Sequence, residues 1–505
     1  MALATMASRV FGLVREQVIA YYYGAGVLVD AFNVAYRIPN LLRDLLAEGA
    51  FSSSFLSEFA KAKVDGKEAM KQLFLQCFWI LFFIAGIYAV ILTTFASKLI
   101  LLFAPEYLPG SEQAIITTEL LKIMSPFLLF MSLGAVAMAV LNTHRIFFLP
   151  AVSPVFFNLS SILVILIAAH FFQNPTISML AWGVLLGGFL QFLVQVPRLY
   201  KEGYRFTFPT KFWGPEVKKV FTKLIPGLFG FAAAQINILI NTILATSSGV
   251  GAVSWLSYAF RIFQLPLGII GVSLGTGNQV YFAEKWKSAQ FAEAADILSR
   301  SLFYSLSLMM FPFLLLAFFP AWPMELLFER GKFSHFDTQM SAMALMGYSF
   351  GLPFYGVHKI LVPVFYTIDK QKIVLAIAVI SILINIALAS LLVSKYGFSI
   401  LAWASTISIS INAILLFCFL PSQLFQKRNF FVRKRVLAFA GLSLSLCGYF
   451  MGLKWILSLI TVNKLWLAMP FLVVPVLLIE LFLSLADEKT FFLFRRKKMN
   501  EKKSL

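Results

Sequence analysis

The sequence has 505 residues, of which 60% are hydrophobic and only 13% are charged. With a mean hydropathy of +0.84, this composition excludes an ordinary soluble protein, in which about a quarter of the residues are charged. The net charge is +19, which suits either a nucleic-acid partner or a membrane protein with basic loops.

Apolar stretches of roughly 20 residues, each long enough to cross about 30 Å of hydrocarbon, recur along the whole chain. Arg9 and Arg15 interrupt the first of them, so we expect no cleavable signal peptide. We predict an all-α polytopic membrane protein with about fourteen transmembrane helices. In chain order these span residues 2–22, 30–57, 73–96, 117–142, 150–172, 177–197, 220–246, 252–282, 298–322, 338–366, 373–394, 398–420, 436–457 and 464–486.

The basic residues outside these helices fall mainly on one side of the predicted membrane. Segments that follow even-numbered helices share a side with both termini and hold about 29 lysines and arginines, whereas the other side holds about six. The positive-inside rule places the richer side, and both termini, in the cytoplasm. The charge is therefore mainly a topology signal, and we expect no nucleic-acid partner.

An internal repeat divides the chain. The stretch "GAGVLVDAFNVAYRI" (24–38) is similar to "GVGAVSWLSYAFRI" (249–262) at an offset of six helices. We predict two parallel six-helix halves, as in many secondary transporters, with the substrate site between them near the bilayer midplane. The predicted parts are an N-terminal half (1–197), a basic cytoplasmic linker (198–219), a C-terminal half (220–420), helices 13 and 14 (436–486) and a basic cytoplasmic tail (487–505).

Seven basic residues fall inside predicted helices, where each costs at least about 2.5–3.5 kcal/mol at the helix centre. Such residues usually face a bundle interior or a water-filled cavity, or reach the headgroups from a helix end. They are Arg9, Arg15, Arg37, Arg43, Lys122, Arg261 and Lys359.

Helical geometry places the charged residues of the second predicted helix on two different faces. At about 100° per residue, Arg37, Asp44 and Glu48 share one face and can balance one another, whereas Arg43 points about 120° away. In the first helix Arg9 shares a face with Glu16, and Arg15 points elsewhere. Neither Arg15 nor Arg43 has an obvious partner in its own helix.

A cavity with several uncompensated arginines suits a multiply charged anion. Arginine offers phosphate a bidentate fork and stays charged at any relevant pH. An amphiphilic substrate could pass its polar head through such a cavity while its lipid tail stays in the membrane. Lys359 either lines the cavity or anchors helix 10.

The motifs at these residues closely resemble those of the MurJ (MviN) family of lipid II flippases, in the MOP transporter superfamily. The resemblance rests on "SRVFGLVRE" (8–16), "GAGVLVDAFNVAYRIPNLLRDLLAEGAFSSSF" (24–55), "VSWLSYAFRIFQLPLGIIGVSLGT" (253–276), "LFERGKFSHFD" (327–337) and "YSFGLPFYGVHKILVPVFYTIDK" (348–370).

The resemblance implies a fourteen-helix flippase, not an enzyme, in the bacterial inner membrane. It would move lipid II, the undecaprenyl-diphosphate-linked peptidoglycan precursor, to the outer face by alternating access, and so serve peptidoglycan biosynthesis, cell-wall biogenesis and cell shape. Besides lipid II and membrane lipids, its expected partners are other proteins of cell-wall synthesis. The resemblance carries substrate-binding roles onto Arg9, Arg15, Arg43 and Arg261, and an acidic gating role onto Asp30. Charge balance is expected of Arg37, Asp44, Glu48 and Lys359.

Two departures from the family pattern stand out. Asp44 occupies a position that is commonly basic, where it lowers the positive charge of the cavity or acts as an internal counter-ion. Helices 7, 11 and 12 offer only amides (Gln235, Asn237, Asn241, Asn385 and Asn412) where some members are thought to bind sodium. Because hard cations prefer carboxylate oxygens, the sequence does not favour a sodium site. The four histidines lack ligand spacing, so we expect neither a metal nor a cofactor.

Two other functions compete with this one. The first is transport of a different cargo of the same superfamily, such as another lipid-linked oligosaccharide or a cationic drug; the arginines argue against the cation. The second is a membrane-embedded transferase, which would need a carboxylate cluster on a sizeable loop. The longest predicted loop, about 198–219, has only Glu202 and Glu216.

Overall fold

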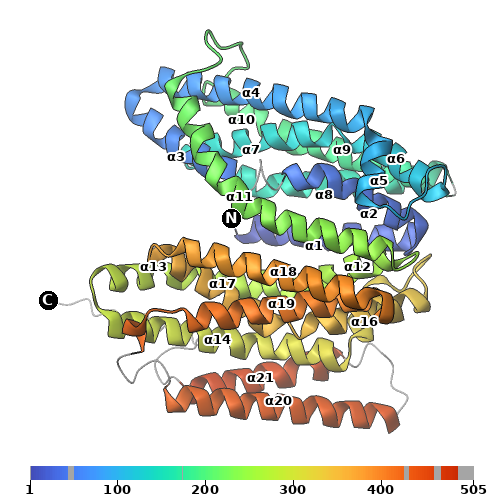
Figure 1. Cartoon of the computed structure of the whole chain (residues 1–505), viewed down its shortest axis with the longest axis vertical. Helices are drawn as coiled ribbons and strands as arrows, with labels where there is room; N and C mark the ends of the chain where they lie inside the picture. Colours follow the sequence, from blue (N-terminus) through green and yellow to red (C-terminus); the bar gives the residue numbers. More distant parts are fainter. Residues whose placement is uncertain (1, 44–49, 173, 426–431, 460–467, 487–505) are drawn as a thin grey trace. The chain divides into compact units, whose positions relative to one another are not determined.

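The computed structural model describes residues 2–43, 50–172, 174–425, 432–459 and 468–486. These segments are helices joined by turns and by longer loops such as the one between α10 and α11, and none of them contains a β-strand (Figure 1). The prediction of an all-α polytopic protein is confirmed. The chain forms two compact units: unit 1 is Met1–Arg261, Ala321–Ala344 and Ile382–Ala404, and unit 2 is Ile262–Pro320, Leu345–Ser381 and Ser405–Leu505. The predicted division by chain order, into 1–197 and 220–420, stays a prediction.

The first eleven helices all belong to unit 1. They are α1 (Ala2–Tyr23), α2 (Val27–Arg43), α3 (Ala50–Asp65), α4 (Lys67–Thr94), α5 (Ala96–Phe103), α6 (Glu112–Met124), α7 (Phe127–Thr143), α8 (Phe148–Phe171), α9 (Ile177–Leu193), α10 (Val196–Lys201) and α11 (Pro215–Thr246).

The later helices are divided between the units, and the unit boundaries cut α12, α16, α18 and α19 within their length. The elements are α12 (Ala252–Pro266), the π-helix η2 (Leu267–Gly271), α13 (Val272–Lys287), α14 (Phe291–Phe318), α15 (Ala321–Phe328), α16 (His335–Ser349), α17 (Leu352–Thr367), α18 (Gln371–Tyr396), α19 (Ser399–Cys418), the 3-10 helix η3 (Ser422–Leu424), α20 (Arg433–Leu459) and α21 (Ala468–Ala486).

In the part of the chain that the structure describes, eight helices are long and apolar enough to cross a membrane. Several other predicted spans are broken helices. The predicted span 252–282 is α12, η2 and α13, and the break follows Pro266, which lacks the amide hydrogen that a regular α-helix requires. The predicted span 338–366 breaks between α16 and α17, where Pro353 occupies the first turn of the new helix.

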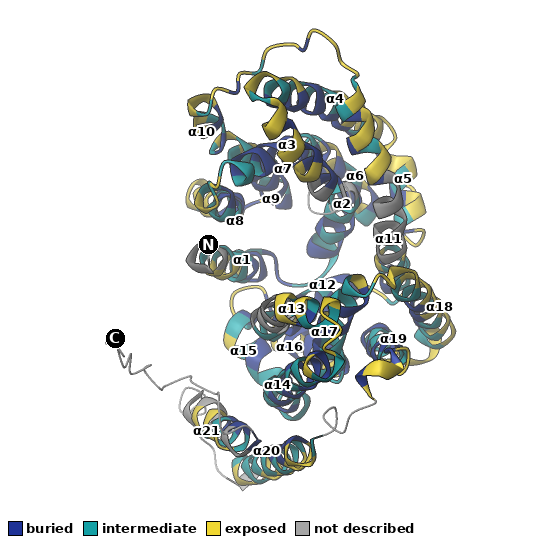
Figure 2. Cartoon of the chain, turned by 90° about the vertical axis from the view of Figure 1, so that its left-hand side faces the viewer, coloured by how far each residue is buried: buried dark blue, intermediate teal, exposed yellow. Residues whose placement is uncertain are grey.

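The buried fraction differs strongly between helices (Figure 2). The most apolar window of the α6–α7 segment is 72% buried, whereas that of α20 is 22% buried. The outer face of α4 exposes Phe83, Ile87 and Val90. A helix of 28 residues that exposes such a stripe is about 42 Å long and suits contact with lipid.

The segment predicted as a linker, 198–219, packs against α4 in unit 1. Trp79 donates its indole N–H to the Thr207 carbonyl at 2.9 Å and stacks on Phe208 with ring centroids 4.2 Å apart. Gln76 donates to the Lys211 carbonyl at 2.8 Å. These bonds satisfy backbone carbonyls that a non-helical segment leaves without helical partners.

Within unit 2, an ion pair between a buried arginine and a partly exposed aspartate links the start of α20 to α14. Arg435 is 5% exposed and donates to Asp296 at 2.8 Å and to Ser299 at 3.2 Å. Arg300 reaches the second oxygen of the same carboxylate at 2.9 Å. A buried arginine with such partners fixes the register of the helix that carries it.

Candidate functional site

One carboxylate in unit 1 connects two of the predicted arginines. Oε1 of Glu16, on α1, accepts a hydrogen bond from Arg15 at 2.6 Å and lies 3.3 Å from Nε of Arg261, on α12, with which it forms an ion pair. The side chains of Arg15 and Glu16 are each 11% exposed, and that of Arg261 is 41% exposed. Two cations therefore share one anion, which leaves a net positive charge on this group of three side chains.

These residues line a small pocket. Its walls come from α1, α2, α9 and α12 and include Tyr36 and Tyr258. The guanidinium of Arg15 lies 5.3 Å from the centroid of the Phe157 ring, within the range of a cation–π contact. Among the described residues, the buried Nε of Arg15 finds no hydrogen-bond acceptor. The pocket holds about 20 Å³, room for about one water, so a diphosphate requires the helices to separate.

The interpretation that Arg15 lacks a partner in its own helix is wrong. Face geometry pairs residues three, four or seven apart, but a long arginine side chain also reaches the neighbouring carboxylate, here Glu16. Glu16 was predicted to share a face with Arg9, which is exposed. The described ion pairs of Glu16 are with Arg15 and Arg261.

The arginines of the second predicted span lie on α2. Arg37 donates to Thr242 of α11, so it bridges two helices of unit 1. Arg43 is half-buried at the end of α2 and repels the like charge of Arg15. Asp44 and Glu48 lie outside the described residues, and their predicted balance with Arg37 stays a prediction.

Asp30 joins the two segments of the predicted repeat. Its carboxylate accepts from the backbone N–H of Gly251 at 2.5 Å, from that of Ser254 at 2.7 Å and from the Ser254 hydroxyl at 2.5 Å. Asp30 is 3% exposed. It therefore caps the N-terminus of α12 from another helix, where a negative charge is favoured by the helix dipole.

Two glycine turns interlock next to this cap. The backbone N–H of Lys332 donates to the Tyr21 carbonyl at 2.9 Å, and Tyr258 donates to the Gly24 carbonyl at 3.0 Å. Gly24 and Gly331 have φ of 70° and 62°. A Cβ on Gly24 would lie 2.6 Å from the Lys332 carbonyl oxygen, and one on Gly331 would overlap the Tyr21 carbonyl. Both positions require glycine for conformation and for space.

A second ion pair of unit 1 links α3 to α11. Glu58, with a side chain 3% exposed, accepts from Lys223, and from Lys61 at 2.9 Å. The hydrogen bond from Lys223 lowers the pKa of the Glu58 carboxyl, which lies beyond the predicted end of the membrane span.

Lys359, which was predicted to line the cavity or anchor its helix, is exposed on α17 in unit 2.

Sequence reasoning missed the roles of Glu16, Ser254 and Gly251. Residue spacing pairs Glu16 with Arg9, and it cannot show a contact with α12. Ser254 and Gly251 lie inside the repeat "GVGAVSWLSYAFRI". The similarity of this stretch to residues 24–38 was the available signal, but it does not show that the two copies bind each other.

Comparisons with known proteins agree on one family. A family model described as lipid II flippase MurJ matches residues 19–477. The chain is 34% identical over 433 residues to a probable lipid II flippase MurJ of Buchnera aphidicola subsp. Acyrthosiphon pisum, covering 85% of this chain and 83% of the relative. It is 35% identical over 422 residues to the lipid II flippase MurJ of Burkholderia cenocepacia, covering 82% and 81%.

Two solved structures are also similar to the chain. A lipid II flippase MurJ in an inward closed conformation matches with a TM-score of 0.78 and 25% identity, over 96% of this chain and 97% of that chain. An inward-facing MATE multidrug transporter of the MOP superfamily matches with a TM-score of 0.71 at 12% identity, over 82% and 93%. The second similarity concerns the fold alone.

We expect Gly331→Ala to destabilise the protein by about 2–4 kcal/mol, because it combines left-handed strain with a backbone clash. Gly110 is a matched control, since it has φ of 84° but nothing within 4 Å; Gly110→Ala should cost only the strain, about 1–2 kcal/mol. Apparent melting temperatures of the purified variants measure the difference. Equal effects of the two substitutions would contradict the close contact between Gly331 and the Tyr21 carbonyl.

Stability should also fall in acid because of Glu58. A carboxyl whose pKa is lower in the folded state stabilises the protein above its unfolded pKa, about 4.3, and this stabilisation disappears as the pH falls through the folded pKa. Because Lys223 is 43% exposed, we expect about 1 kcal/mol. Glu58→Gln should reduce the fall of the melting temperature between about pH 5 and 3. Glu68→Gln, at a carboxyl that is 83% exposed, should leave this fall unchanged. Identical pH profiles would contradict the assignment.

Proposed function

The chain belongs to the lipid II flippase MurJ family, and on that basis we propose that it moves lipid II from the cytoplasmic to the outer face of the bacterial inner membrane. The protein is a multi-pass membrane transporter and not an enzyme. We place both termini in the cytoplasm, from the distribution of its basic residues.

The observation that carries the proposal is the shared carboxylate of Glu16. With two arginines on one anion, the site keeps a positive charge that a diphosphate can neutralise. Arg15 and Arg261 would each offer a guanidinium fork to the phosphate oxygens. The buried Nε of Arg15, without an acceptor among the described residues, is a donor suited to such an anion. Arg43 and Arg9 would contribute further positive charge, nearer the point of entry.

Transport then requires two openings. The pocket beside Arg15 is too small for a diphosphate, so the helices around it must separate for the headgroup to enter. The turns at 24–26 and 249–251 follow predicted odd-numbered helices and therefore lie on the outer side of our topology. There the Asp30 cap on α12 would hold the outer end closed, and release of the headgroup would require this cap to break.

The lipid tail and the driving force complete the proposal. Helices 13 and 14, observed as α20 and α21, would supply a groove for the prenyl chain. The membrane potential is an available drive, at about 2.3 kcal/mol per charge per 100 mV.

Further partners are expected among other proteins of cell-wall synthesis. The same arginines would accept other diphosphate-linked sugars, so the test has to use a strain that depends on lipid II transport.

Neutralising an arginine of the site should abolish function. We expect Arg43→Ala and Arg261→Ala to fail to support growth when the resident lipid II flippase of a bacterium is depleted, while the unmodified chain supports it. Lys122→Ala is the matched control, because Lys122 is exposed on α6, and it should support growth. Membrane abundance, measured in parallel, separates loss of function from loss of protein. Full growth with either arginine variant would overturn its assignment.

A further inference from the structure

Three side chains of the kind that bind metals meet in unit 1 where α15 ends and α16 begins. They are Glu325, Glu329 and His335, and their ligand atoms lie within 4.8 Å of one another. Glu325 and Glu329 are half-buried and His335 is exposed. None of the three takes part in the arginine site. In the topology proposed above this turn follows helix 9, so the cluster would face the outer side of the membrane.

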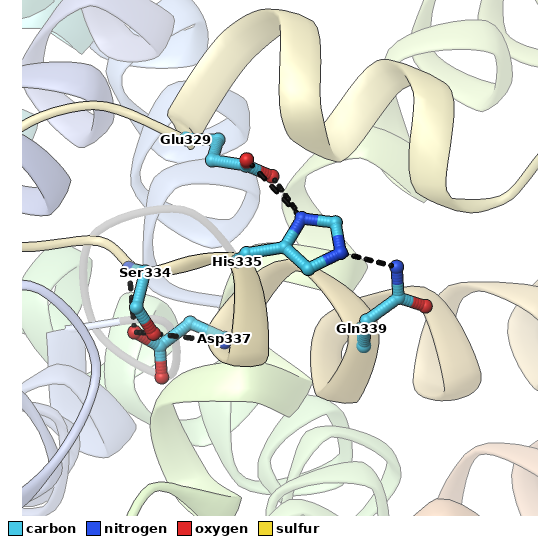
Figure 3. A network of polar contacts seen from close by, with 5 residues as sticks. All are labelled: Glu329, Ser334, His335, Asp337 and Gln339. Carbon is cyan, nitrogen blue, oxygen red and sulfur yellow. Dashed lines mark hydrogen bonds and ion pairs between the residues drawn. The ribbon is translucent and has the colours of Figure 1, made fainter.

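The imidazole is already directed at one carboxylate. Nδ1 of His335 lies 3.2 Å from each of the two oxygens of Glu329, and Nε2 lies 3.2 Å from the side-chain amide of Gln339 (Figure 3). Ligand atoms about 2.0–2.1 Å from a tetrahedral zinc ion lie about 3.3 Å from each other. The Glu329–His335 separation therefore already matches one edge of such a site. With a metal on Nδ1, Nε2 would carry the hydrogen, so the Gln339 amide would turn its oxygen toward the ring to act as an outer-shell acceptor.

The electrostatics of the helix end favour a cation at this place. Glu325 lies in the last turn of α15 and Glu329 directly after the helix, and their carboxylate oxygens are close enough for the two like charges to repel each other. They also lie at the C-terminus of α15, where the helix dipole disfavours anions. Of the neighbouring charged residues, Arg330 donates to the Leu326 carbonyl at 3.0 Å, and Asp337 accepts from Ser334 and from Trp255.

We propose that Glu325, Glu329 and His335 bind a divalent transition-metal ion of the zinc type. One imidazole nitrogen and two carboxylate oxygens form a ligand set typical of zinc, and a water can complete the tetrahedron. Calcium and magnesium prefer ligand sets made only of oxygen. The spacing of the histidines and cysteines predicts no metal site, but such spacing does not reveal carboxylates that lie beside a single histidine.

The bound ion would act on the contact between this turn and α1. The turn from Glu329 to His335 carries Lys332, whose N–H binds the Tyr21 carbonyl at 2.9 Å. Just before it, the Leu327 carbonyl accepts from Gln17 at 3.1 Å. An ion that joins Glu329 to His335 closes the turn as a ring and so stiffens the surface that holds the end of α1. Zinc should therefore raise the stability of this part of unit 1.

The test uses the full chain, purified in detergent through a tag without histidine and stripped with a chelator. Cobalt(II) should bind with visible d–d absorption bands that zinc abolishes by displacement. Zinc titrated by calorimetry should bind with one site per chain and raise the apparent melting temperature. His335→Ala, and separately Glu329→Gln, should weaken zinc binding at least tenfold.

Two variants serve as controls. His170→Ala removes an exposed histidine of α8, and Cys418→Ser removes an exposed thiol; both should leave zinc binding unchanged. The cobalt spectrum of the unmodified chain needs no variant, so a misfolded variant cannot hide the result. Absence of zinc-sensitive cobalt bands, or equal zinc affinity with His335→Ala, would overturn the proposal and leave a Glu–His ion pair.

Discussion

The structure depends on how unit 1 keeps arginines inside an apolar helical bundle. A buried guanidinium without a counter-ion costs several kcal/mol, and one carboxylate, Glu16, serves both Arg15 and Arg261. This arrangement stabilises the two arginines only in part. It holds together helices that are more than 200 residues apart in sequence, and it leaves positive charge for a substrate. A second carboxylate at the site would stabilise the protein further, but it would remove the reason for an anion to bind.

The second constraint is the interlock of glycine turns around Asp30. The carboxylate caps α12 from α2, and the turn that carries Lys332 binds the end of α1. Each of these contacts uses backbone groups at helix termini or in the turn between α15 and α16, which need partners in any case. Breaking them exposes unsatisfied N–H and C=O groups, so the interlock is suited to two discrete states, closed and open. The candidate zinc site lies on the same turn and would shift the balance between those states.

Much of the fold was predictable because the membrane imposes a strong rule on sequence: each span needs about 20 apolar residues. The rule identified α4, α8 and α14 directly. It did not predict that the span 252–282 contains a π-helix, because a residue count says nothing about the missing amide of Pro266. The sequence shows which arginines are energetically costly inside the membrane, but it does not show which residues they pair with. Glu16 contacts Arg15 by adjacency and Arg261 across space, and a helical wheel shows neither contact.

The central claim is that Arg15 and Arg261 hold the diphosphate of lipid II. It is tested most directly by equilibrium binding of lipid II to the purified chain, compared with Arg15→Gln and Arg261→Gln variants that retain the native melting temperature. Loss of one charged hydrogen-bonding group is worth about 1.5–3 kcal/mol, so the account predicts that each substitution weakens binding by at least tenfold. Inorganic diphosphate should compete with lipid II for the unmodified protein. Unchanged affinity in both variants would contradict the account.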